Sequence, residues 1–314
     1  MINDEGIERQ TFIVPEHYPQ MSLADCLRRL GVSLNLRRKI KHHGVVRIDG
    51  VVCPWYVEVS PKSKIQMEWT IASQITPEDI PLAIVYEDDW LLIVDKPAGM
   101  LVHPTPKQPG GTLANAVVHY YRQLGYTHAF HPVQRLDRNT SGLLTIAKLS
   151  SIHHLMNKQR LRRRYLAIAT GTPEVAEGII DLPIARHPDS IIIRIVSSTG
   201  QDAITHYRVL QSFPTASLLQ LELETGRTHQ IRLHLSHIGH PLLGDDLYGG
   251  KTDLIARQAL HSSFLELQHP ITGAVISLSS PLPQDLEQLL KQLDTHVSAV
   301  ASHREKNNSI NQEG

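Results

Sequence analysis

The sequence is poor in cysteine, with Cys26 and Cys53 as its two thiols among 314 residues. Two thiols so far apart predict neither a disulfide framework nor a zinc knuckle, and they fit a reducing compartment. The chain also lacks an excess of either charge, since 31 lysines and arginines balance 31 aspartates and glutamates. Bulk electrostatic attraction to a nucleic acid or to a membrane is therefore excluded, and any such attraction has to come from local patches.

Long hydrophobic runs are absent too, because no apolar stretch reaches the roughly 18 residues that a membrane-spanning helix needs. The first residues include Asp4, Glu5, Glu8 and Arg9, which is not the pattern of a signal peptide. We therefore expect a soluble, cytoplasmic protein that contacts no membrane. The length and the 41% of hydrophobic residues allow about two domains with at least one conventional core.

Residues 1–75 are predicted to form a small separate unit. Ser22 and Ser33 each precede a segment with apolar residues at helical spacing that ends at a glycine, which predicts helices over 23–30 and 34–43. The pair Asp49-Gly50 between short runs of valine and isoleucine predicts a hairpin over 45–52.

This N-terminal unit is locally basic, with seven lysines and arginines against two aspartates between residues 21 and 50. Such a run forms either a solvated helix face or an RNA-binding surface, and the compact helix–helix–hairpin order favours RNA binding. The unit resembles the small αL RNA-binding domain named after ribosomal protein S-four. The residues predicted to bind RNA here are Arg37, Arg38, Lys39 and Lys41.

After a predicted linker at 76–81, residues 82–295 are expected to form one larger domain, followed by a polar, disordered tail at 296–314. Helices are predicted over 113–124, after Thr112, and over 284–293. Strands are predicted over 82–86, 91–95, 100–103, 143–147, 165–169, 191–196, 203–209 and 218–222. Strand runs without a steady strand–helix alternation indicate an α+β fold with a mixed, mainly antiparallel sheet.

The segment 134–142 is the most informative stretch. It places Asp137 between Arg135 and Arg138 and continues with Asn, Thr, Ser and Gly, residues that favour turns and caps. We expect an exposed carboxylate on a tight loop, in a position to act as a nucleophile or a base. In a second segment, Thr228 is predicted to cap a helix that carries His229 and Arg232 on one face and ends at Gly239.

Other features allow less specific interpretations. His234, His237 and His240 are spaced three apart, but His240 lies beyond Gly239 and no cysteine or acid stands at a familiar ligand spacing, so we expect no metal. The basic run 158–164 is either a solvated helix end or a phosphate track. Its candidate RNA-binding residues are Arg162, Arg163 and Arg164.

Taken together, the segments resemble the RluA family of pseudouridine synthases over roughly residues 80 to 290. The matching stretches, in the family's order, are 96–99, 102–104, 135–137, 140–143, 147–148, 165–167, 225–232, 234–235, 239–241, 244–245, 248–249, 260–262 and 269–273. One residue departs from the pattern, since Gln134 stands where the family usually carries histidine. Glutamine donates and accepts hydrogen bonds but cannot titrate.

The resemblance implies an isomerase that converts uridine in RNA to pseudouridine without a cofactor. It implies that Asp137 is the catalytic carboxylate, which either attacks the sugar or removes a sugar proton, and that Arg232 pairs with it. Tyr165 is implied to stack on the uracil and to help deprotonate its carbon 5. Arg135 is implied to fill the gap left by a flipped-out nucleotide, and Leu233 to form an apolar wall. The further substrate-binding residues are Thr140, Arg227, His229 and Gln230.

Large-subunit ribosomal RNA is the expected substrate, because the S-four-like unit resembles that of ribosomal RNA modifiers, and transfer RNA is the alternative. We expect a monomer. Two other classes are less favoured. An RNA-binding assembly factor without catalysis is disfavoured because Asp137, Tyr165 and Arg232 are all present, and a metal-dependent hydrolase is disfavoured by the histidine spacing.

Overall fold

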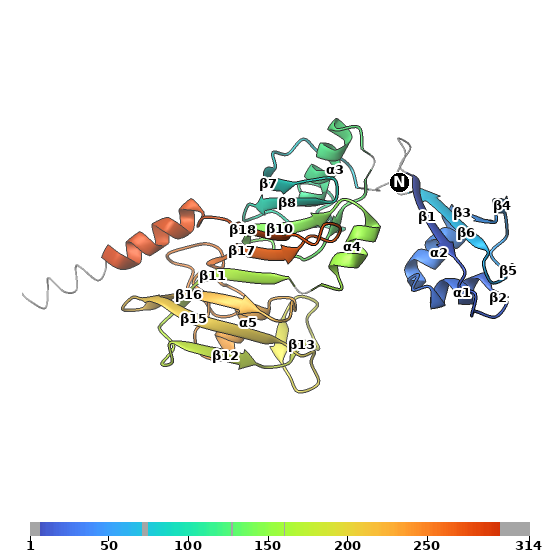
Figure 1. Ribbon diagram of the computed structural model, residues 1–314. Helices are drawn as coiled ribbons and strands as arrows, with labels where there is room; N and C mark the ends of the chain where they lie inside the picture. Colours follow the sequence, from blue (N-terminus) through green and yellow to red (C-terminus); the bar gives the residue numbers. More distant parts are fainter. Residues whose placement is uncertain (1–6, 71–74, 127, 160, 296–314) are drawn as a thin grey trace, which may run out of the picture. The chain divides into compact units, whose positions relative to one another are not determined.

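A computed structural model describes residues 7–70, 75–126, 128–159 and 161–295 of the chain, and the predicted tail at 296–314 lies outside them. The chain divides into two compact units (Figure 1). One comprises residues 1–79 and 117–130, and the other residues 80–116 and 131–314. Among the described residues, none of the helices has both the length and the apolar composition required to cross a bilayer.

The N-terminal unit contains the predicted pair of helices and the hairpin. Its helices are α1 (Leu23–Arg29) and α2 (Leu34–His43), and their N-terminal amides are capped by the hydroxyls of Ser22 and Ser33. Four antiparallel strands follow the order β1-β6-β3-β4, with bounds Ile7–Ile13, Lys64–Thr70, Gly44–Ile48 and Val51–Val52. The short strands β2 (Met21–Ser22) and β5 (Glu58–Val59) form a separate pair. The helices bury Leu23, Leu27 and Ile40 in a core shared with Ile65 and Met67 of the sheet.

The second unit is built on one large sheet. Its main strands follow the order β12-β15-β16-β11-β17-β10-β8-β7. Their bounds are Glu177–Asp181, Ile204–Ser212, Ala216–Leu223, Arg162–Thr170, Leu260–Gln268, Ser141–Ala147, Leu91–Lys96 and Ala83–Glu87. Strand β18 (Val275–Ser279) adds to β17, and β9 (His131–Pro132) adds to β10. Strands β13 (Ile184–Arg186) and β14 (Arg194–Val196) form a separate hairpin. Every neighbouring pair in the large sheet is antiparallel except β10 with β17, which confirms the predicted mixed, mainly antiparallel sheet.

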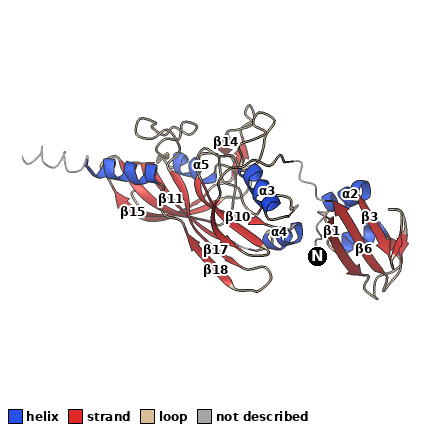
Figure 2. Ribbon diagram, turned by 90° about the horizontal axis from the view of Figure 1, so that it is seen from above, coloured by secondary structure: helices blue, strands red, loops and turns tan. Residues whose placement is uncertain are grey.

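The remaining helices are short. They are α3 (Leu113–Gln123), which begins in the second unit and continues into residues assigned to the first, α4 (Ser150–Met156) and α5 (Gln230–His237), and residues 284–295 form a last helix. Figure 2 shows α5 and β14 together on one face of the large sheet. Strand β10 is buried along its whole length, whereas β16 alternates buried and half-buried residues, because the sheet is covered on both faces only near its centre.

Three local predictions were wrong. Residues 100–103 form no strand, because the carbonyls of Leu101 and Val102 accept the amides of Leu113 and Ala114 at the start of α3. In the predicted strand 191–196, only Arg194–Val196 is extended. The basic run does not end a helix, because α4 stops at Met156 and the arginines begin β11.

The parallel junction of β10 and β17 depends on a glycine. Gly142 pairs with Ser262 and has φ +110°, a conformation that side chains other than glycine rarely adopt. A Cβ at this position would collide with the backbone carbonyl of Ser262. The turn at 137–140 that carries Asp137 immediately precedes this junction, so the close backbone approach also sets where that turn lies.

We predict that Gly142→Ala lowers the free energy of unfolding by about 3 kcal/mol, because both the left-handed backbone and the collision oppose the new methyl group. Gly273→Ala is the control, since Gly273 has φ +74° but a Cβ there would meet only the side-chain nitrogen of Gln268, at an ordinary contact distance of 3.8 Å, and we expect it to cost about 1 kcal/mol. Urea unfolding of both variants measures the difference. Equal losses of stability in the two variants would contradict the packing argument.

Candidate active site

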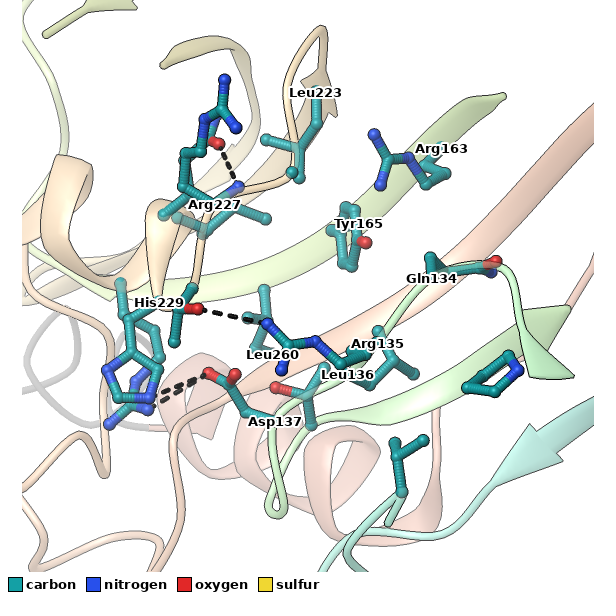
Figure 3. Close-up of a pocket in the computed structure, with 18 of the residues that line it drawn as sticks. Gln134, Arg135, Leu136, Asp137, Arg163, Tyr165, Leu223, Arg227, His229 and Leu260 are labelled. Carbon is teal, nitrogen blue, oxygen red and sulfur yellow. Dashed lines mark hydrogen bonds and ion pairs between the residues drawn. The ribbon is translucent and has the colours of Figure 1, made fainter. Parts of the chain in front are cut away.

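Most of the predicted catalytic and substrate-binding residues line one cleft of about 550 Å³ in the larger unit (Figure 3). Its walls come from five parts of the chain: the segment 101–105, the segment 132–140 that enters β10, the start of β11, the end of β16 with the loop that leads into α5, and Leu260 of β17. Such a volume lies within the usual range of small-ligand sites. Asp137, Tyr165 and Arg232, which are far apart in sequence, all line it.

Asp137 lies on a tight turn, as predicted. The amide of Thr140 donates to the Asp137 carbonyl at 3.1 Å, which closes the turn. The Asp137 side chain is 24% exposed, so its carboxylate is accessible from the cleft. Its Oδ2 accepts a hydrogen bond from Nη1 of Arg232 at 3.2 Å, and the expected ion pair between these two residues is present.

Arg232 is itself held by a second carboxylate, that of Asp245. Its Nε and Nη2 donate to Oδ2 and Oδ1 of Asp245, each at 2.8 Å, and Asp245 is fully buried. Asp245 Oδ1 also accepts the amides of Leu247 and Tyr248. The bidentate pair fixes the plane of the guanidinium and leaves Nη1 to face Asp137. Asp245 was missed as a site residue, although residues 244–245 are among the stretches that carry the family resemblance.

His229 lies close to both Asp137 and Tyr248. It has φ +59° and is itself the N-cap of α5, so the prediction that Thr228 caps this helix was wrong. Its Nδ1 lies 3.0 Å from the Tyr248 hydroxyl, and its Nε2 lies 3.9 Å from Asp137 Oδ2. Burial lowers the pKa of His229 and outweighs the opposing charge of Asp137, so the imidazole is neutral at pH 7. When the tyrosine hydroxyl donates to Nδ1, the Nε2 hydrogen points toward Asp137.

Tyr165 stands on the wall formed by β11, and in Figure 3 it lies between Asp137 and Arg163. It is buried, and burial raises the pKa of its phenol, so the hydroxyl is protonated at neutral pH. The apolar part of the lining includes Val102, Leu136, Leu223 and Leu260.

Leu233 does not form part of this wall among the described residues. It packs instead with Ile184, Ala203 and Tyr248 in a separate cluster. The reason is helical geometry: Leu233 follows Arg232 by one residue and therefore points about 100° away from it around α5. The predicted apolar wall exists but is made by other residues.

The predicted substrate-binding residues have different surroundings. Thr140, Arg135, Arg227 and Gln230 all line the cleft. Arg135 is exposed at the rim, 3.5 Å from the Thr228 hydroxyl, and Arg227 donates to the Asp202 carbonyl. The Gln230 amide is buried and fully occupied by the protein. Its oxygen accepts from Thr225 and Arg227, and its nitrogen donates to Ile204 and Thr205.

The three consecutive arginines of β11 do not share one face. Successive side chains of a strand point to opposite sides. Arg163 therefore joins Tyr165 in the cleft, whereas Arg162 and Arg164 lie on the other face and both pair with Glu222, at 3.0 and 3.1 Å. The prediction of a phosphate track made of all three arginines was wrong on this point.

Two of the three histidines spaced three apart in the sequence make ordinary hydrogen bonds. His234 contacts the Thr205 hydroxyl and the Leu182 carbonyl, and His240 contacts the Thr170 carbonyl. Within the described ranges, no group of three histidine, cysteine or acidic side chains has the arrangement of a metal site.

Gln134, the departure from the family pattern, is buried in the cleft lining, and its Oε1 has no hydrogen-bond partner among the described residues.

The chemistry available here is that of a single carboxylate. Asp137 is the one acidic residue in the lining of this cleft, as far as the described residues show. Hydrolysis of a glycosidic bond by the usual mechanism requires a pair of acids flanking the bond. A lone, oriented carboxylate beside apolar side chains and an aromatic ring agrees with the site that the resemblance to pseudouridine synthases implies.

Comparison with known proteins agrees with this geometry. Residues 90–237 match the family described as RNA pseudouridylate synthase. The RNA pseudouridine synthase YjbO of Bacillus subtilis is 38% identical over 279 residues, covering 86% of this chain and 99% of the relative. Ribosomal large subunit pseudouridine synthase D of Escherichia coli is 38% identical over 272 residues, covering 78% of this chain and 82% of the relative.

A solved structure shows the same architecture. The structure titled human RNA Pseudouridylate Synthase Domain Containing 1 superimposes with a TM-score of 0.53 at 25% identity, over 69% of this chain and 96% of the human chain. The fold, the cleft and the sequence relationships lead to one conclusion. The chain belongs to the RluA family of RNA pseudouridine synthases.

Proposed function

We propose that Asp137 is the catalytic carboxylate of this pseudouridine synthase and that its substrate is large-subunit ribosomal RNA. The first part is supported by one observation. Asp137 is the sole acid among the described lining residues, and it accepts a hydrogen bond from Arg232, whose guanidinium is held by Asp245. The second part is supported by relatives named as ribosomal large subunit pseudouridine synthase D, at 38 to 42% identity in Escherichia coli and Haemophilus ducreyi.

The reaction is an isomerisation that leaves the composition of the nucleotide unchanged. The bond between uracil nitrogen 1 and the sugar breaks, the base turns within the pocket, and carbon 5 bonds to the same anomeric carbon. The hydrogen of carbon 5 leaves as a proton and nitrogen 1 gains one. Asp137 acts on the sugar, either by attack on the anomeric carbon or by removal of a neighbouring proton, and both routes need a carboxylate held in place, which the ion pair with Arg232 achieves.

The remaining cleft residues bind and orient the nucleotide. Tyr165 packs against the uracil, and we assign it to packing rather than to proton removal because a buried phenol with a raised pKa is a poor base at neutral pH. Arg135, exposed at the rim, fills the gap that a flipped nucleotide leaves in the RNA. Gln230 holds the loop 225–228 in place through its four hydrogen bonds.

The N-terminal unit contributes RNA affinity through α2. Arg38 and Lys41 are exposed and Lys39 is half-buried, so these side chains are available to phosphates. Arg37 differs, because its Nη1 donates to the Ala24 carbonyl of α1 and so helps to join the two helices.

We predict that Asp137→Asn abolishes pseudouridine formation, because the amide keeps the shape of the side chain but is neither a nucleophile nor a base. Cells that lack this gene are complemented with the wild type, Asp137→Asn, or the control Asp246→Asn, an exposed residue outside the cleft lining. Pseudouridine is then mapped in ribosomal and transfer RNA. Sites restored only in transfer RNA would refute the proposed substrate, and sites restored by Asp137→Asn would refute the catalytic role.

We predict that Arg163→Gln weakens RNA binding by roughly five- to tenfold at about 0.1 M salt, the effect expected when one phosphate is no longer neutralised. Arg162→Gln is the matched control, because it makes the same change one residue earlier, on the face where Glu222 neutralises the charge. Filter binding to transcribed large-subunit ribosomal RNA measures both. Equal affinities for the two variants would contradict a role for Arg163 in the cleft.

We predict that Arg38→Gln combined with Lys41→Gln weakens binding to the same RNA. The slope of log affinity against log salt should fall by about 1 for each phosphate that the variant no longer neutralises. The control is Lys62→Gln with Lys64→Gln, two exposed lysines elsewhere in the same unit. A salt dependence unchanged from the wild type would assign the basic helix a purely structural role.

A further inference from the structure

The backbone of the turn that carries Asp137 is held by buried donors from other parts of the chain. The Arg138 carbonyl accepts Nζ of Lys96 at 3.0 Å, and the Asn139 carbonyl accepts Nη1 of Arg257, also at 3.0 Å. The Thr140 hydroxyl accepts the Gln258 amide at 3.3 Å. Since the turn consists of short polar residues without a core of its own, these contacts decide how the Asp137 side chain is presented to the cleft.

Arg257 is the donor with the most constrained geometry. It is 9% exposed, and all of its nitrogens are engaged. Nε and Nη2 donate to the two carboxylate oxygens of Asp285, at 2.6 and 2.9 Å. Besides the Asn139 carbonyl, Nη1 reaches the carbonyls of Gln258 and Leu260, each at 3.3 Å. The carboxylate therefore fixes the guanidinium plane from one side while the opposite edge is directed at the turn.

Asp285 belongs to the first turn of the last helix, residues 284–295. This helix is anchored independently of the Arg257–Asp285 ion pair, because Leu286, Leu289 and Leu293 are buried in a cluster with Ile168 and Leu243 of the larger unit. Burial opposes ionisation of Asp285, but the hydrogen bonds and charge of Arg257 outweigh it and lower the pKa of this carboxyl. The pair is thus charged at neutral pH, and its removal leaves the apolar contacts of the helix intact.

We infer that Arg257, oriented by Asp285 of the C-terminal helix, is a positioning residue that holds the Asn139 carbonyl and so aims the Asp137 carboxylate at the sugar. Both residues lie beyond residues 90–237, the part of the chain that matches the family description. The inference rests on the proposed role of Asp137. It extends the catalytic apparatus to the C-terminal helix, which contributes nothing to the lining of the cleft among the described residues.

The competing explanation is that the Arg257–Asp285 pair only stabilises the fold. The two explanations differ in what a conservative change does. A purely stabilising pair affects melting but not turnover in the folded enzyme. A positioning pair affects kcat while leaving KM nearly unchanged, because RNA still binds but the carboxylate spends less time in the productive orientation.

The test compares Arg257→Lys and Asp285→Asn with the wild type. Lysine keeps the charge but cannot bridge Asp285 and Asn139, and asparagine keeps the size but not the charge. The matched controls are Arg164→Lys and Glu222→Gln, which alter an arginine–glutamate pair of the same sheet that does not contact the turn. Steady-state release of tritium from carbon 5 of uridine in transcribed large-subunit ribosomal RNA gives kcat and KM, well below each melting temperature.

We expect Arg257→Lys and Asp285→Asn to lower kcat by about tenfold or more, with KM within about threefold of the wild type, and the controls to leave both constants unchanged. Asp285→Glu is expected to recover more of the turnover than Asp285→Asn. Wild-type kcat in Arg257→Lys, or a change confined to KM or to the melting temperature, would overturn the inference.

A second measurement does not depend on catalysis. Hydrogen exchange at the Thr140 amide, which is bonded to the Asp137 carbonyl, is expected to accelerate in Arg257→Lys and not in Arg164→Lys. Unchanged exchange would overturn the inference. Asp137→Asn in the same turnover assay separates the two proposals: activity in that variant removes the role of Asp137, whereas an inactive Asp137→Asn beside a fully active Arg257→Lys removes the positioning role alone.

Discussion

The site depends on one guanidinium shared between two carboxylates. Arg232 is almost completely buried, and a buried cation is stable only when it is paired and fully hydrogen-bonded. Asp245 meets that requirement with a bidentate contact, which frees Arg232 from needing Asp137 for its own stability. The remaining N–H can therefore orient a carboxylate that stays partly exposed to the cleft and open to the substrate.

The turn that carries Asp137 shows the same arrangement, in which buried side chains hold the structure and the Asp137 carboxylate stays accessible from the cleft. Asp137 is presented by a backbone whose carbonyls are held by Lys96 and Arg257, so its carboxylate makes few structural contacts of its own. Burial lowers the pKa of Lys96 to about 7, whereas its three carbonyl acceptors favour the ammonium form. Preorganisation by groups that do not touch the substrate leaves the cleft free for the rotation of the base.

Close approach of backbones provides the remaining constraint. Gly142 lets β10 meet β17, and Gly244 and Gly250 lie where a Cβ would collide with the carbonyls of Arg257 and Leu242. The loop that these last two glycines permit is the one that delivers Asp245 to Arg232. The sheet and the Arg232–Asp245 ion pair therefore both depend on glycines at positions that have no room for a Cβ atom.

Local features were readable from the amino-acid sequence alone. Serine caps and glycine ends defined both helices of the N-terminal unit, and turn-forming residues around Asp137 predicted its loop. Matching segments in order predicted the family and the Asp137–Arg232 pair. Tertiary structure alone decided that Asp245 orients Arg232, that Arg163 faces the cleft while Arg162 and Arg164 do not, and that Leu233 packs away from it. The reason is that caps and turns arise from neighbours along the chain, whereas burial, ion-pair partners and the facing of a strand depend on contacts between separate segments. Arg232 and Asp245 are 13 residues apart and Arg162 and Glu222 are 60 residues apart, and only folding brings these pairs together.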